Sequence, residues 1–126
     1  MMLRKDAKIL IADDSKIIRM AMSRIFNELG YDNVIQAEDG AQAVERHASD
    51  RPDLIMLDIV MPNMTGDDAL AKIRSTDKTT PVIMLSSLAK QSQIDACTAL
   101  GIVAFVVKPL TAEDGKGVIG GLLNRL

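Results

Sequence analysis

The sequence has a single cysteine, no tryptophan and very few aromatic residues. Of its 126 residues, one is Tyr and two are Phe, while 48% are apolar, so a core must be built from aliphatic side chains. Cys97 has no second cysteine with which to form an intrachain disulfide, and with one histidine it cannot complete a Cys/His zinc site. We interpret Cys97 as a small buried hydrophobe.

Charge of one sign and long apolar runs are also missing. The 15 basic and 17 acidic residues give a formal net charge of −2, and no lysine or arginine run suggests a nucleic-acid surface. Residues 1–8 lack the apolar region of a signal peptide, and no stretch approaches the length of a membrane span. We therefore expect one cytoplasmic domain over residues 1–126, with no membrane contact and no direct contact with nucleic acid.

Short aliphatic runs alternate with longer amphipathic runs, which is typical of βαβ units and a parallel sheet in an α/β fold. The expected strands cover residues 8–12, 33–37, 54–57, 82–85 and 104–107. The expected helices cover residues 16–29, roughly 67–75, about 90–100 and 111–125, and a further helix begins at residue 39. Asp39 and Gln42 have the spacing of a capping box, and Ala41, Val44 and Ala48 form the predicted apolar face of that helix. Gly30 follows the first helix as a C-terminal cap.

The last expected helix is rich in glycine. Val118, Ile119, Leu122 and Leu123 recur at helical spacing, but glycines at 115, 117, 120 and 121 interrupt them. Each interior glycine costs a helix about 0.8–1 kcal/mol relative to alanine. This helix must therefore depend on tertiary contacts or on a partner.

The residues just after each strand carry the chemistry, because ligands of open parallel sheets collect at the carboxyl ends of the strands. A single Asp in such a place is more often a cap or turn residue than a ligand. Several carboxylates packed together are not explained in this way, because they repel one another. Two like charges about 4 Å apart cost on the order of 4 kcal/mol at an effective dielectric near 20. The convergent residues are Asp13, Asp14, Asp58, Ser86, Ser87, Lys108 and Pro109.

Three carboxylates with open positions favour Mg²⁺, which accepts oxygen ligands and borrows phosphate oxygens. Lys108 supplies a second positive charge, so that the metal and the lysine could bracket a phosphoryl group. A carboxylate can then act as the nucleophile and become an aspartyl-phosphate.

The segment 57–66 places Asp58 at a strand end, with Pro62 and Gly66 shaping the loop that follows. Together with Asp13-Asp14, Ser86 and Lys108-Pro109, each after its own strand, this segment resembles a response-regulator receiver domain of two-component signalling. That family includes the single-domain chemotaxis regulator. The resemblance covers nearly the whole chain and implies a flavodoxin-like fold with a five-stranded parallel sheet, order 2-1-3-4-5, and helices on both faces.

The resemblance implies a role for each residue of the site. Asp58 resembles the phosphoacceptor that takes a phosphoryl group from a sensor histidine kinase or a phosphotransfer protein. Asp14 resembles the direct Mg²⁺ ligand, and Asp13 resembles the acid that holds the metal, commonly through water. The backbone carbonyl of Val60 resembles a further ligand, and Lys108 resembles the lysine that pairs with the phosphoryl group.

The resemblance also implies a switch. Ser86 resembles the hydroxyl that turns toward the phosphoryl group, and Phe105 resembles the aromatic side chain that moves inward with it. Ser87 stays open as an alternative, although Ser86 directly follows the aliphatic strand. A cis bond between Lys108 and Pro109 is expected by the same resemblance. The output surface, for a downstream protein target or a homodimer, is expected on the fourth helix, fifth strand and fifth helix.

Two positions that tune dephosphorylation in the family are apolar here, Val60 and Leu88. Neither side chain can orient an attacking water, so we expect a long-lived phosphoryl state. No conventional turnover is expected, only catalysis of the chain's own phosphorylation and dephosphorylation.

Other interpretations remain open. A phosphorylation-independent pseudo-receiver is one, and an aspartyl-phosphate hydrolase is a less favoured one, because such enzymes place a second Asp where this chain has Val60. The sequence fits a stand-alone regulator and a part of a longer protein equally well. We expect His47 to be a solvated surface residue, and Lys16, Arg19 and Arg24 to form the solvated side of the first helix.

Overall fold

The computed structural model describes residues 3–87, 89–108 and 112–126. Strands and helices alternate along these residues, as the sequence predicted. The strands are β1 (Ile9–Ala12), β2 (Val34–Ala37), β3 (Leu54–Asp58), β4 (Val82–Ser86) and β5 (Ala104–Val107). The helices are α1 (Lys16–Glu28), α2 (Gly40–Asp50), α3 (Gly66–Arg74), α4 (Gln91–Leu100) and α5 (Ala112–Leu123).

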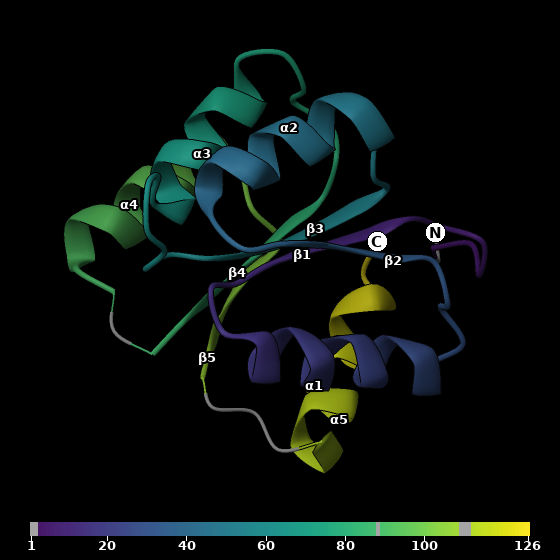
Figure 1. Ribbon diagram of the computed structural model, residues 1–126. Helices are drawn as coiled ribbons and strands as arrows, with labels where there is room; N and C mark the ends of the chain where they lie inside the picture. The colour runs from purple at the N-terminus through teal and green to yellow at the C-terminus, as the bar shows by residue number, and fades with distance from the viewer. Residues whose placement is uncertain (1–2, 88, 109–111) are drawn as a thin grey trace.

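The five strands form one parallel sheet in the order β2-β1-β3-β4-β5, which confirms the predicted topology. Helices α2, α3 and α4 cover one face, and α1 and α5 cover the other (Figure 1). Every residue of β1, β3 and β4 is buried, because these strands are covered on both faces and have neighbours on both sides.

Alternate residues of each central strand supply the two cores. Ile9 and Ile11 of β1 point into the cluster that includes residues of α1 and α5, whereas Leu10 and Ala12 belong to the cluster with residues of α2, α3 and α4. Both cores are mainly aliphatic, as predicted. Among the described residues, the one contact between two aromatic rings is an edge-to-face pair of Phe26 and Tyr31, with ring centroids 6.3 Å apart.

The predicted helix ends are confirmed at α1 and α2. Asp39 caps α2 by accepting a hydrogen bond from the Gln42 backbone N–H at 2.8 Å. The Gln42 side chain accepts one from the Glu38 N–H at 3.0 Å, one residue before the Asp39 N–H that a capping box would use. Gly30 follows α1 with φ +99°, a conformation that glycine adopts without a steric penalty.

The buried faces of α1 and α2 differ from the expectation. Ala48 is exposed, and the inward stripe of α2 instead runs through Gly40, Ala43 and the half-buried His47. On α1, Arg19 is buried, with 7% of its surface exposed, and is not on the solvated side. In both helices a polar side chain of the inner face is partnered by a residue outside its own helix: Arg19 by Gln36 and the Asp13 carbonyl, and His47 by Asp77. No helix among the described residues is long and apolar enough to span a membrane.

Candidate functional site

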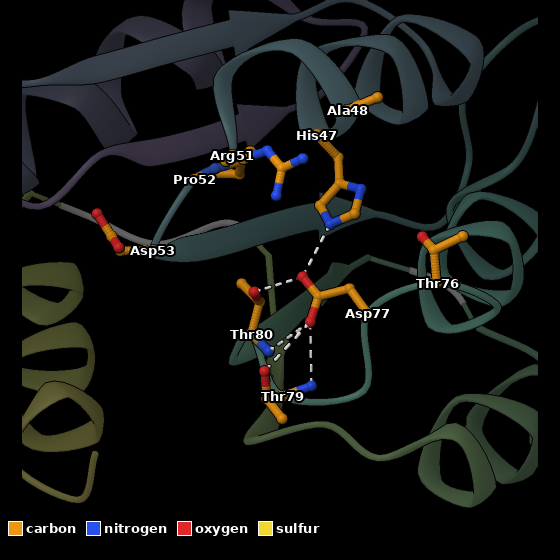
Figure 2. Close-up of a pocket in the computed structure, with 9 residues that line it drawn as sticks. All are labelled: His47, Ala48, Arg51, Pro52, Asp53, Thr76, Asp77, Thr79 and Thr80. Atoms are coloured by element: carbon orange, nitrogen blue, oxygen red, sulfur yellow. Dashed lines mark hydrogen bonds and ion pairs between the residues drawn. The ribbon is translucent and has the colours of Figure 1, made fainter.

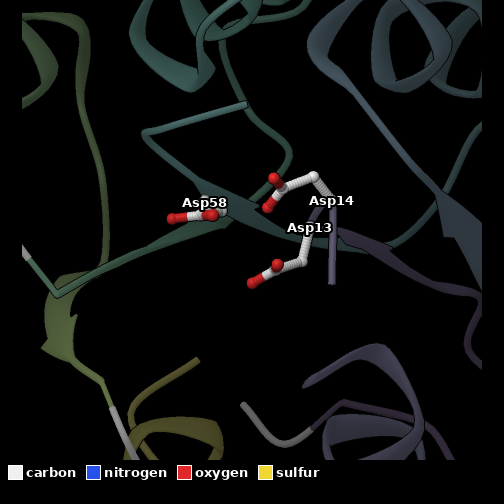
Figure 3. A group of neighbouring side chains, drawn as sticks. All are labelled: Asp13, Asp14 and Asp58. Carbon is white, nitrogen blue, oxygen red and sulfur yellow. The ribbon is translucent and has the colours of Figure 1, made fainter. Parts of the chain in front are cut away.

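Three carboxylates meet at the carboxyl end of the sheet, as the strand ends predicted. Asp13 and Asp14 follow β1, and Asp58 is the last residue of the neighbouring strand β3. Each offers one oxygen, and these oxygens all lie within 4.8 Å of one another (Figure 3). Asp13 and Asp58 are buried, whereas Asp14 is exposed, so the cluster opens to solvent on the side of Asp14.

Lys108 joins this cluster from the end of β5. Its Nζ lies 2.9 Å from Asp13 Oδ2 and 3.1 Å from Asp58 Oδ2. Burial raises the pKa of Asp58, the neighbouring charge of Asp13 raises it further, and the Lys108 hydrogen bond opposes both. Burial alone would lower the pKa of Lys108, but its bonds to the two carboxylates raise it overall. The Lys108 ammonium therefore pairs with two of the three clustered carboxylates, which leaves an excess of negative charge in this group of four side chains.

Ser86 ends β4, next to the strand that carries Asp58. It is 5% exposed, and its Oγ has no hydrogen-bond partner in the part of the chain that the structure describes. A buried hydroxyl without a partner costs about 1–3 kcal/mol, and such a group calls for an explanation. Ser87 is exposed, so Ser86 is the hydroxyl held at the sheet edge. Phe105 is partly buried against the core under α2, α3 and α4.

The donor set fits a hard divalent cation. Carboxylate oxygens with one exposed side suit Mg²⁺, which retains waters and seldom sits in an all-protein cage. The excess negative charge suits a bound cation, and the unpartnered Ser86 hydroxyl suits an anionic group beside it. Val60, whose backbone carbonyl is the expected further ligand, lies two residues after Asp58, and the residue is 61% exposed.

The loop from Ile59 to Thr65 is shaped by glycine and by a tight turn. A Cβ on Gly66 would lie 1.9 Å from the carbonyl oxygen of Asp58, so only glycine fits there. The Gly66 N–H donates to the Ile59 carbonyl at 2.8 Å, and the Met64 N–H donates to the Pro62 carbonyl at 2.7 Å. The predicted roles of Pro62 and Gly66 in shaping this loop agree with these contacts.

Sequence reasoning missed Arg19. Its guanidinium donates to the Asp13 backbone carbonyl at 2.7 Å and to Gln36 Oε1 on β2 at 3.0 Å, and it lies 3.8 Å from Glu38. Arg19 thus ties the chain at Asp13 to the neighbouring strand. The available signal was its place near the start of α1, six residues after Asp13.

His47 is also not a solvated residue. Its Nε2 lies 2.9 Å from Asp77 Oδ2, and 12% of its side chain is exposed. Asp77 accepts further hydrogen bonds from the backbone and hydroxyl groups of Thr79 and Thr80, and together they lower its pKa, with His47 contributing most. The pair lines a cavity of about 560 Å³ (Figure 2).

That cavity lies at the other end of the sheet from the carboxylates, since Asp53 and Thr80 precede β3 and β4. The cavity is therefore separate from the site at Asp58, and the oxygens of Asp77 within it are already in contact with His47, Thr79 and Thr80. Two predicted features, the apolar residue Leu88 and the bond before Pro109, lie outside the described residues.

Comparisons with known proteins agree with this geometry. A family model described as "Response regulator receiver domain" matches residues 9–119. The chain is 38% identical over 117 residues to "Chemotaxis protein CheY" of Bacillus subtilis, covering 93% of this chain and 98% of that protein. A "CheX-CheY-BeF3-Mg+2 complex" from Borrelia burgdorferi superposes with a TM-score of 0.83 at 34% identity, covering 94% of this chain and 88% of that one.

A parallel sheet of this order with convergent carboxylates defines the CheY-like receiver fold. The chain belongs to the response regulator receiver domain family of two-component signalling.

Proposed function

We propose that this chain is a phosphorelay response regulator that accepts a phosphoryl group on Asp58 and thereby changes its affinity for a partner. The observation that carries the proposal is the meeting of Asp58 with Asp13, Asp14 and Lys108 at one sheet edge. An Asp58 carboxylate oxygen attacks the phosphorus of a phosphohistidine on a sensor kinase or phosphotransfer protein. The O–P bond forms as the P–N bond breaks, and the released imidazole takes its proton from solvent.

Lys108 and the neighbouring acids have different electrostatic roles in the proposed transfer. Lys108 favours the ionised form of Asp58 before the transfer and can pair with phosphoryl oxygens after it. Asp13, Asp14, Asp58 and the Val60 carbonyl would hold Mg²⁺. When bound, Mg²⁺ supplies neutralisation of the charge on the phosphoryl oxygens.

The buried Ser86 hydroxyl is the first element of the proposed switch. A phosphoryl group adds about −1.5 to −2 charge and three acceptor oxygens, so an unpartnered hydroxyl nearby gains a strong partner. Ser86 is paired in register with Val107 on β5, two residues beyond the partly buried Phe105. A movement of Ser86 therefore passes to Phe105 and to the surface of α4, β5 and α5, the proposed site for a target protein or a homodimer.

Apolar side chains at the rim suit a protein as phosphodonor. Ile17 is 79% exposed, Val60 is 61% exposed and Val107 is 70% exposed, and each lies within three residues of a site residue. A protein that presents a phosphohistidine can cover these side chains while it excludes water from Asp58. We place this exchange in the cytoplasm, a compartment that suits the unpaired Cys97.

The test is intact-mass spectrometry after incubation with acetyl phosphate and Mg²⁺. We expect a gain of one phosphoryl mass, which Asp58→Asn and chelation of the metal both abolish. The added mass should persist over the time course, since Val60 cannot orient water; rapid loss would contradict the long-lived state. No gain under any condition would refute the proposal and leave a phosphorylation-independent interaction module. Continuous release of phosphate from a phosphomonoester would instead reveal a hydrolase.

A further inference from the structure

Asp39 connects the start of α2 to the loop that follows the phosphoacceptor. Its Oδ1 accepts the Gln42 backbone N–H at 2.8 Å, and its Oδ2 accepts the Asn63 side-chain Nδ2–H at 2.8 Å. The residue is 8% exposed, and these two hydrogen bonds lower its pKa, the Gln42 bond more strongly. Asp39 is therefore a fixed carboxylate with both oxygens engaged, which separates it from the three acids that gather at Asp58.

A backbone contact one residue along each segment reinforces this connection. The Gly40 N–H donates to the Met64 carbonyl at 3.0 Å. A Cβ on Gly40 would lie 2.2 Å from that same carbonyl oxygen, so the first turn of α2 touches the loop directly. The loop is thus held at Asn63 and Met64 by α2, and at Gly66 by its own hydrogen bond to Ile59.

Asn63 serves this loop in two ways. Its φ is +66°, a left-handed conformation that asparagine tolerates better than most side chains other than glycine. Its amide also supplies the donor that Asp39 accepts. Because Asn63 lies three residues after Val60, fixing its position limits where the Val60 carbonyl can point.

We propose that Asp39 and Asn63 are positioning residues whose hydrogen bond holds the loop so that the Val60 carbonyl and the Asp58 carboxylate face one cation. This inference rests on the proposed function and assigns work to two residues outside the carboxylate cluster. Outer hydrogen bonds that orient ligands typically change metal affinity by 10- to 100-fold when removed. We expect roughly tenfold weaker Mg²⁺ binding without this bond, the lower end of that range.

The experiment measures the Mg²⁺ dissociation constant by titration calorimetry, with circular dichroism to verify folding. Asn63→Gly removes the amide but keeps a residue that accepts φ +66°, so it isolates the hydrogen bond from backbone strain. Asn63→Asp sets two carboxylates face to face. The double variant Asp39→Asn/Asn63→Asp restores the bond with its direction reversed, because the amide introduced at position 39 can still cap α2 through its oxygen and donate to the new acid. Asp53→Ser is the control, since it removes a carboxylate bond to the Lys8 N–H at the far end of the sheet.

We expect N63G and N63D to weaken Mg²⁺ binding and D39N/N63D to recover it to within about twofold of the wild type, because two residues that share a hydrogen bond are expected to show non-additive effects. N63D separates the inference from a simple charge effect, because an extra negative charge alone would tighten cation binding. D53S should lower stability without changing the Mg²⁺ affinity. Unchanged binding in folded N63G, or tighter binding in N63D, would overturn the positioning role while leaving phosphorylation of Asp58 intact. A wild-type chain that binds no Mg²⁺ and takes no phosphoryl group would refute the proposed function as well.

Discussion

Helix α5 should become more stable when two of its glycines are replaced. A Cβ added at Gly117 or at Gly121 would meet no atom within 4 Å, and both residues lie inside the helix. The substitution to alanine therefore removes backbone freedom from the unfolded chain and adds no clash. Each should contribute about 0.5–1 kcal/mol to the free energy of unfolding, with the smaller gain at Gly121 near the helix end.

The double variant Gly117→Ala/Gly121→Ala should thus gain about 1–2 kcal/mol. For a domain of this size such a gain raises Tm by roughly 3–10 °C. Urea unfolding followed by circular dichroism measures the free energy, and calorimetry measures Tm.

Gly101 provides the matched control. A Cβ there would also meet nothing within 4 Å, but its φ is +91°, which a side chain disfavours. Gly101→Ala should therefore destabilise the fold by about 1 kcal/mol or more. If G101A stabilised the chain, or if the α5 variant lost stability, backbone conformation would not be the deciding factor and the reasoning would be wrong.

Two further predictions concern buried polar contacts. Arg19→Met should lower the free energy of unfolding by about 1–3 kcal/mol, because it leaves the Asp13 carbonyl and Gln36 without their donor, whereas Arg24→Ala on the exposed face should change it by less than about 0.5 kcal/mol. Urea titrations of both variants measure this difference. The lowered pKa of Asp77 stabilises the fold above the ordinary carboxyl pKa near 3.9 and loses that effect as the pH falls toward the lowered value. Asp77→Asn should therefore cost less stability at pH 3 than at pH 6, and an equal cost at both would contradict the assignment.

The fold could be predicted because its signals are local and repeated. Ile9 to Ala12 is a short apolar run, and a strand covered on both faces needs nothing more. The helix signals at Asp39 and Gly30 are equally local, since a cap bonds within its own first or last turn. The meeting of Asp13 with Asp58 followed from topology, because parallel neighbours end at the same edge.

Contacts between distant segments could not be predicted in this way. Arg19 looked solvated because it was grouped with Lys16 and Arg24 as one basic side of α1, but its acceptor Gln36 comes from β2. His47 looked solvated because its partner Asp77 lies 30 residues away. In both cases the sequence gives the residue type, but it does not reveal the distant partner that allows the polar atoms to be buried.

The surroundings of each aspartate explain why this residue type has different roles in the chain. Asp39 and Asp77 sit where hydrogen-bond donors of their own surroundings occupy their oxygens, and each has a lowered pKa. Asp58 sits beside two other carboxylates and shares one ammonium with Asp13, and burial raises its pKa. An acid satisfied by its own fold has no need of a cation or a phosphoryl group of its own, so Asp77 stabilises structure and Asp39 holds the start of α2 and the loop at Asn63 together. Among the described residues, Asp58 and Asp13 share the ammonium of Lys108, and the remaining negative charge would favour a bound cation at this edge of the sheet.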